Sequence, residues 1–180
     1  MVLSMLPRAF PAAVLVVQHL DWRSRSYLAE LLARDCRMPV FHADAGEAIH
    51  PGAVYVAPPG THLTLTGDHV RLGHEAPRHF ARPSVDVLFE SVASTCGPDA
   101  IGVILTGTGV DGADGLRAIK RAGGRTIVQE PATAEFRGMP AAAEATGCAD
   151  MMLPLAGIAP ALLGLLRAGA LASEEGAETT

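Results

Sequence analysis

The sequence has few cysteines, few aromatic residues and few charges, and each shortage narrows the range of functions. Only three cysteines, Cys36, Cys96 and Cys148, occur among 180 residues, and none forms a C-x-x-C pair. An odd number of widely spaced cysteines argues against a disulfide framework and indicates free thiols in a reducing compartment. We therefore expect a cytoplasmic protein.

Basic residues are also scarce. There are 14 Lys and Arg against 19 Asp and Glu, which gives a net charge of −5 at pH 7. Nucleic acids and anionic membranes bind basic faces, so we expect no nucleic-acid partner. We also expect no membrane insertion, because no apolar run approaches the roughly 18 residues of a membrane span. The first ten residues lack the pattern of a cleaved signal peptide.

Apolar residues are abundant, at 49% of the chain, which is enough for one domain over residues 1–170 without a disulfide or metal. Short β-branched runs such as Ala13–Gln18 are typical of parallel strands buried on both faces. These runs alternate with helical patterns. We predict strands at 13–18, 52–56, 100–105, 125–129 and 151–155, and helices near 28–32 and at 84–95, 116–121, 139–146 and 158–168.

This alternation predicts an α/β fold with a doubly wound, mostly parallel sheet and helices on both faces. Residues 62–72 alternate polar and apolar side chains, which predicts a small antiparallel hairpin. Residues 171–180 are small and acidic, so we expect a flexible tail there. In sheets of this kind the ligand site lies beyond the carboxyl ends of the strands.

His19 and Asp111 each come just after a predicted strand. If those strand ends are neighbours, about 4.8 Å apart, the carboxylate can hold one imidazole nitrogen and leave the other to take a proton from a nucleophile. The alternative without a catalytic role is a strand-end histidine that hydrogen-bonds to the backbone and an aspartate that caps a helix. Spacing alone favours that alternative.

The run Gly107–Gly112 matches G-x-G-x-x-G between a strand and a helix, with Glu130 after the next strand. This pattern is typical of a dinucleotide site. Asp111 counts against it, because its negative charge would stand at the helix N-terminus where a pyrophosphate must bind. We keep a dinucleotide-binding domain as the less favoured hypothesis.

The remaining polar residues give weaker signals. The other six histidines have no metal-ligand spacing, so we expect surface histidines and no metal site. No cofactor is indicated. Arg82 precedes a predicted helix start at Ser84 and could bind an acidic substrate group or form a surface ion pair. The six histidines other than His19 are His42, His50, His62, His69, His74 and His79.

Five segments in order resemble the catalytic domain of the chemotaxis protein-glutamate methylesterases. They are residues 16–20 (VVQHL), 52–60 (GAVYVAPPG), 82–89 (RPSVDVLF), 102–115 (GVILTGTGVDGADG) and 138–140 (GMP). The resemblance covers most of the chain. It implies a cytoplasmic carboxylic ester hydrolase with a Ser-His-Asp mechanism that demethylates, and in some members deamidates, glutamyl residues on chemoreceptor helices.

The resemblance also implies roles for individual residues. His19 matches the general base and Asp111 the triad carboxylate. Thr108 stands where the family usually has Met, and with Arg82 it is a candidate for substrate binding. Methylated chemoreceptor helices are the implied partners, and a separate regulatory subunit is a further candidate.

The family's nucleophilic serine lies in a G-[AT]-S-x-G-G turn some two dozen residues before the histidine. Only eighteen residues precede His19, and Ser4 aligns within a helix, so we expect an N-terminally truncated domain without its nucleophile. Ser24, Ser26 and Ser84 are substitute candidates. Because loss of the nucleophile removes most turnover, a non-catalytic remnant or receptor-binding module is the main alternative.

Overall fold

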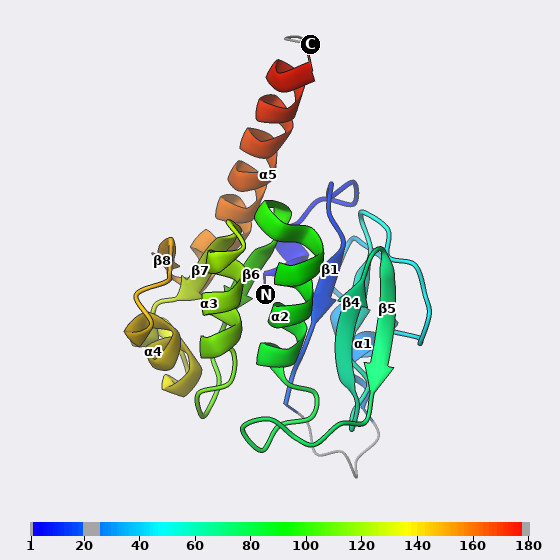
Figure 1. The fold of residues 1–180 in the computed structure, drawn as a ribbon, viewed down its shortest axis with the longest axis vertical. Coiled ribbons are helices and arrows are strands. Elements are labelled where there is room, and N and C mark those ends of the chain that lie inside the picture. Colours follow the sequence, from blue (N-terminus) through cyan, green and yellow to red (C-terminus); the bar gives the residue numbers. More distant parts are fainter. Residues whose placement is uncertain (1, 20–25, 178–180) are drawn as a thin grey trace.

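Parallel strands form the centre of the fold, as the alternating pattern predicted. The computed structural model describes residues 2–19 and 26–177 (Figure 1). The parallel strands form two three-stranded sheets, with the orders β1-β3-β2 and β6-β7-β8. The strands are β1 (Val14–Val16), β2 (Val40–His42), β3 (Val54–Val56), β6 (Ile101–Ile104), β7 (Arg125–Gln129) and β8 (Met151–Leu153). The sequence predicted a single sheet, and β1 and β6 are not hydrogen-bonded to each other.

The predicted hairpin is present and pairs antiparallel, with Leu63 opposite Leu72. It consists of β4 (His62–Thr66) and β5 (His69–Gly73). In the part of the chain that the structure describes, five α-helices accompany the strands: α1 (Leu28–Ala33), α2 (Val85–Cys96), α3 (Ala113–Arg121), α4 (Gly138–Ala145) and α5 (Leu155–Ala177). Three short 3₁₀ turns lie at Leu3–Met5, Gly97–Asp99 and Pro131–Thr133.

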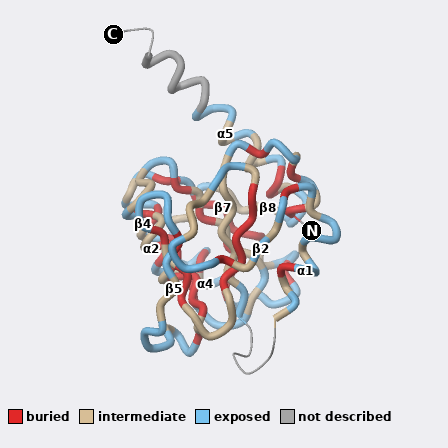
Figure 2. Tube along the Cα trace, turned by 90° about the vertical axis from the view of Figure 1, so that its right-hand side faces the viewer, coloured by how far each residue is buried: buried red, intermediate tan, exposed pale blue. Residues whose placement is uncertain are grey.

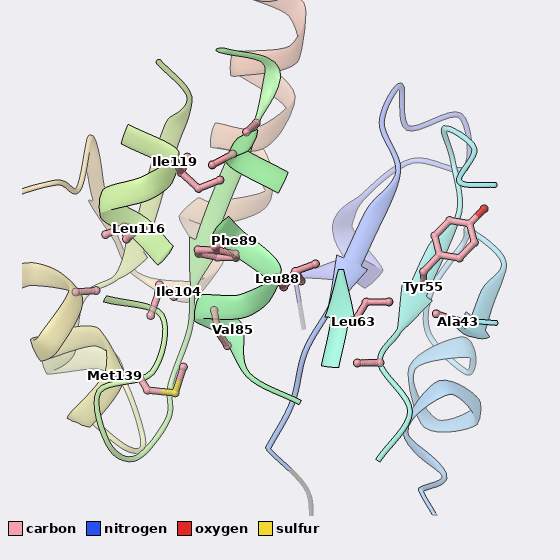
Figure 3. Packing of buried hydrophobic residues seen from close by; sticks show 14 of the residues in the cluster. Ala43, Tyr55, Leu63, Val85, Leu88, Phe89, Ile104, Leu116, Ile119 and Met139 are labelled. Atoms are coloured by element: carbon pink, nitrogen blue, oxygen red, sulfur yellow. The ribbon is translucent and has the colours of Figure 1, made fainter. Parts of the chain in front are cut away.

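Alternate side chains of β1, β3, β7 and β8 enter different hydrophobic cores. Tyr55 of β3 packs in the core formed with α2, α3, α4 and the hairpin (Figure 3). Val54 and Val56 of the same strand pack in the other core, with α1 and the first turns of α5. The parallel strands are therefore covered on both faces, and buried segments run through the middle of the molecule in Figure 2.

The structure differs from the sequence prediction at two elements. Strand β2 was not predicted, because only two apolar residues stand in a row there, between Pro39 and His42. Helix α5 was predicted to end at Ala168 but continues to Ala177, so much of the segment assigned to a flexible tail is helical. Ala, Leu and Glu dominate that segment, and they are strong helix formers.

Two smaller expectations are also corrected or tested. His62 was expected on the surface, but it is buried at 1% exposure, and one of its ring nitrogens contacts the Ala76 carbonyl at 3.2 Å. The second expectation concerns insertion into a membrane. Among the described helices, none is both long enough and apolar enough to cross a bilayer.

Candidate active site

His19 and Asp111 lie in contact, which their positions after strands allow but which their spacing alone did not favour. His19 lies three residues beyond the end of β1, and Asp111 lies just before Gly112, the N-cap of α3. The distance from His19 Nε2 to Asp111 Oδ2 is 2.7 Å. An ionised carboxylate can only accept a hydrogen bond, so Nε2 carries the proton and Nδ1 is the nitrogen that could accept another. The imidazole is 31% exposed and the carboxylate 2%.

Asp111 is held by the N-terminus of α2. Ser84 Oγ donates to Oδ1 at 2.7 Å, and the backbone N–H of Val85 donates to Oδ2 at 2.7 Å. The N–H of Asp86 also donates to Oδ1, at 3.1 Å. Burial by itself would raise the pKa of Asp111, but the hydrogen bonds from His19, Ser84 and the two backbone groups lower it to about 2. The carboxylate is therefore ionised and fixed in orientation at neutral pH.

Asp86 makes the matching contact in the other direction: it lies in α2 and binds the N-terminus of α3. Its Oδ1 accepts hydrogen bonds from the N–H groups of Gly112 at 3.0 Å and Gly115 at 2.6 Å, at the start of α3. Each helix N-terminus thus binds a carboxylate that comes from the neighbouring segment, which satisfies N–H groups that helices leave unpaired. Burial, and the negative charge of Asp111 nearby, raise the pKa of Asp86 despite the Gly115 hydrogen bond.

This arrangement counts against a dinucleotide site at Gly107–Gly112. A pyrophosphate would need the N–H groups at the start of α3, and the Asp86 carboxylate already occupies those of Gly112 and Gly115. A second carboxylate, Asp111, lies directly before them. The glycines have a different use, which is close packing.

The loop that carries Asp111 is packed tightly against the start of α4. Gly107 N–H donates to the Phe136 carbonyl at 3.0 Å, and Met139 N–H donates to the Gly107 carbonyl at 2.9 Å. A Cβ at Gly107 would come within 2.2 Å of the Met139 sulfur, and one at Gly138 within 2.7 Å of the Gly109 nitrogen. Two of the segments singled out in the sequence therefore fix each other's position.

All four candidate site residues line one cavity of about 460 Å³: His19, Arg82, Thr108 and Asp111. Thr108 is exposed at its mouth. Arg82 Nη1 donates to the carbonyls of His74 and Glu75, each at 3.0 Å, so this end of the guanidinium holds the preceding loop. The cavity therefore combines an imidazole–carboxylate pair with a cation on its wall.

A cluster beside the cavity was not predicted from the sequence. Single ligand atoms of His79, Asp86 and Asp114 lie within 4.8 Å of one another, close enough to approach a cation. The guanidinium of Arg78 lies 3.8 Å from Asp86 Oδ2 and 3.6 Å from Asp114 Oδ2. Because this fixed positive charge already neutralises the carboxylates, the cluster is better suited to an ion-pair network than to a metal ion.

The substitute serines are not placed equally well. Ser84 is fully buried and commits its hydroxyl proton to Asp111, and its oxygen caps α2 through Val87 N–H at 3.5 Å. It supports the acid, so we do not assign it the role of nucleophile. Ser26 Oγ accepts from Leu28 N–H at 3.2 Å. Ser24 lies outside the described residues.

The fold and the site define an α/β protein with an imidazole–carboxylate pair at the carboxyl ends of its strands. Comparison with known proteins narrows this class. The family model of the CheB methylesterase matches residues 1–162. The chain belongs to the CheB methylesterase family.

Individual relatives agree with this assignment. The chain is 45% identical over 162 residues to protein-glutamate methylesterase/protein-glutamine glutaminase 2 of Cupriavidus metallidurans, covering 89% of this chain and 48% of the relative. It is 46% identical over 167 residues to a protein-glutamate methylesterase/protein-glutamine glutaminase of Bordetella parapertussis, covering 90% and 47%. The chain thus spans about half the length of these relatives.

A solved structure matches the fold as well. The crystal structure of the Thermotoga maritima CheB methylesterase catalytic domain has a TM-score of 0.87 and 34% identity, with 91% of each chain covered. The predicted α/β architecture with a small antiparallel pair is therefore confirmed.

Proposed function

We propose that the chain is a protein-glutamate methylesterase domain that acts in bacterial chemotaxis. The His19–Asp111 pair at 2.7 Å in the wall of the cavity carries this proposal. Its substrates are γ-glutamyl methyl esters on the cytoplasmic helices of chemoreceptors, and glutamine side chains are a second substrate class. Cytoplasmic location and a separate regulatory subunit belong to the same proposal.

In the proposed reaction a serine hydroxyl attacks the ester carbonyl and passes its proton to the imidazole of His19. The tetrahedral intermediate expels methoxide, which leaves as methanol with that proton, and water then hydrolyses the acyl-enzyme by the reverse proton route. Asp111 keeps the proton on Nε2 and stabilises the imidazolium. We assign the nucleophile to none of the described residues, so its absence stays a prediction.

Thr108 and Arg82 are the proposed substrate-contacting groups. Thr108 is exposed at the cavity mouth, and Arg82 forms part of its wall. A cationic wall suits a receptor segment in which unesterified glutamates neighbour the ester. This role would use the part of the guanidinium that does not bind the carbonyls of residues 74 and 75.

The proposal is tested by release of labelled methanol from a chemoreceptor cytoplasmic fragment that carries methyl-esterified glutamates. A chain that supplies a nucleophile should release methanol, and His19→Ala should then lose at least roughly a thousandfold of that release. His69→Ala is the matched control, since that histidine is exposed on β5 and pairs with Asp68. Equal rates in the His19 variant and wild type would refute the proposed base.

The same fragment distinguishes the alternative function. Binding of the fragment without any methanol release from the wild-type chain would indicate a receptor-binding module. That outcome would also support the predicted lack of a nucleophile, because the imidazole–carboxylate pair would then have no hydroxyl to activate.

A further inference from the structure

A tight turn at the rim of the cavity has an unusual backbone. Arg78 and Ala81 exchange two backbone hydrogen bonds, of 3.1 and 2.8 Å, around His79 and Phe80. These two central residues have φ angles of 48° and 63°. Two successive left-handed residues define a type I′ turn, which strongly prefers Asn-Gly. A histidine and a phenylalanine are costly there, because their Cβ atoms crowd the backbone.

Side chains around the turn hold it in this conformation. His79 Nε2 lies 3.3 Å from the buried Oδ2 of Asp86, the residue whose other oxygen caps α3. Arg78 donates to Glu90 Oε2 at 2.7 Å. The turn therefore contacts α2 through Arg78 and His79, and His79, Phe80 and Ala81 line the cavity.

The turn exposes the apolar ring of Phe80 to solvent. Phe80 is fully exposed, at 104%, and it lines the same cavity as His19 and Asp111. Val110, 50% exposed, is a second apolar side chain of that cavity. Strained backbone and an uncovered aromatic side chain both cost stability, and such costs concentrate at functional sites.

A methyl ester and its glutamyl side chain are small enough to react inside the cavity. Among the described residues none covers Phe80, so its ring is available to a group that extends beyond the reacting ester. The polypeptide around that group has this size. An apolar side chain of the substrate that packs on Phe80 would remove its own surface and that of the ring from water. Burial of this kind is the usual source of affinity at an aromatic contact residue.

We propose that Phe80 is a specificity-determining residue that contacts an apolar side chain of the receptor polypeptide next to the esterified glutamate. This inference rests on the proposed function. It assigns the receptor, and no other macromolecule, as the occupant of the rim.

The test is the affinity of the purified chain for the methylated chemoreceptor fragment, measured by isothermal titration calorimetry. We expect Phe80→Ala to weaken binding by roughly tenfold, as for a typical aromatic contact residue, and Phe80→Leu to weaken it by about twofold because an apolar surface remains. Phe41→Ala is the control. Phe41 is 47% exposed on β2 and does not line the cavity, so this variant should bind as wild type does.

A further variant separates binding from folding. Phe80→Gly suits the left-handed backbone, so its thermal unfolding midpoint should equal or exceed that of wild type while its binding falls as in Phe80→Ala. Wild-type affinity in either variant, or an equal loss in Phe41→Ala, would overturn the inference and leave the proposed function standing. If the wild-type chain neither binds nor demethylates the fragment, the proposed function fails and the inference fails with it.

Discussion

At the scale of single residues, Asp111 accepts hydrogen bonds from an imidazole, a hydroxyl and two backbone N–H groups. Only the imidazole could be inferred from the sequence. His19 and Asp111 both follow strands, and the carboxyl ends of parallel strands share an edge of the sheet. The other donors belong to a helix 25 to 27 residues earlier, and nothing in local sequence fixes how two helices pack.

The lowered pKa of Asp111 predicts a specific loss of stability in acid. Its folded-state pKa is about 2, below the ordinary value of 3.8, so its ionised form stabilises the folded state. The contribution is present above pH 3.8, on the order of 2 kcal/mol, and is lost as the pH falls from 3.8 through about 2. We expect the gap in unfolding free energy between wild type and Asp111→Asn to shrink over that range.

Urea unfolding curves at several pH values measure this gap. Asp68→Asn is the control, because that carboxylate is 74% exposed and its removal should change stability little at any pH. A gap for Asp111→Asn that stays constant between pH 7 and 2 would show that the carboxylate is not held as an anion in the folded protein.

At the scale of elements, α2 and α3 are joined by exchange of carboxylates at their N-termini. Asp111, just before α3, binds the first turn of α2, and Asp86 in α2 binds the first turn of α3. The exchange requires the helices to lie close. Gly115 permits this, since a Cβ there would come within 2.6 Å of Phe89 Cβ and 3.0 Å of Asp86 Cα.

Substitution of Gly115 by Ala should therefore separate the two helices. We expect Gly115→Ala to lower the free energy of unfolding by about 2 kcal/mol, in the range of overpacked cores, despite the better helix propensity of Ala. It should also reduce methanol release, because Asp111 shifts with the helix that binds it.

Gly164→Ala is the matched control in α5, where an added Cβ meets nothing within 4 Å. It should raise the free energy of unfolding by roughly 0.5–1 kcal/mol, the usual gain for Gly to Ala inside a helix. Equal stability changes of the two variants in urea unfolding would contradict close packing at Gly115.

The elements show where prediction from sequence is strong and where it fails. Helix α2 was predicted almost to the residue, since Ser84 is a clear N-cap and apolar residues recur at helical spacing. Strand β2 was missed because its apolar run is only two residues long, between Pro39 and His42, whereas the equally short β1 lies within a longer apolar run. The turn at 78–81 was also missed, because its His-Phe pair breaks the preference by which such turns are recognised.

At the scale of the whole molecule, β1 and β6 are two of the four edge strands of the parallel sheets, and β2 and β8 are the others. Within residues 2–19 and 26–177, β1 is hydrogen-bonded to β3 and β6 to β7, and neither has a second strand partner. Their central residues, Leu15 and Val103, are only partly buried. Unpaired edges of apolar strands are templates for association.

We therefore expect the purified chain to self-associate as its concentration rises, which sedimentation velocity would show as a growing fraction of larger species. Phe80→Ala is the control that distinguishes the two exposed apolar features, since removal of the ring should leave edge-driven association unchanged. A single monomeric species at every concentration would contradict the expectation.

The exchange of carboxylates between α2 and α3 has a consequence for reading other members of the family. Natural selection on folding alone is enough to preserve Asp111, because a chain that had abandoned catalysis would still need it to join the two helices. An aspartate at this position is consequently a poor marker of a working enzyme. His19, whose imidazole is about one-third exposed and supports no helix, is the more informative residue to inspect.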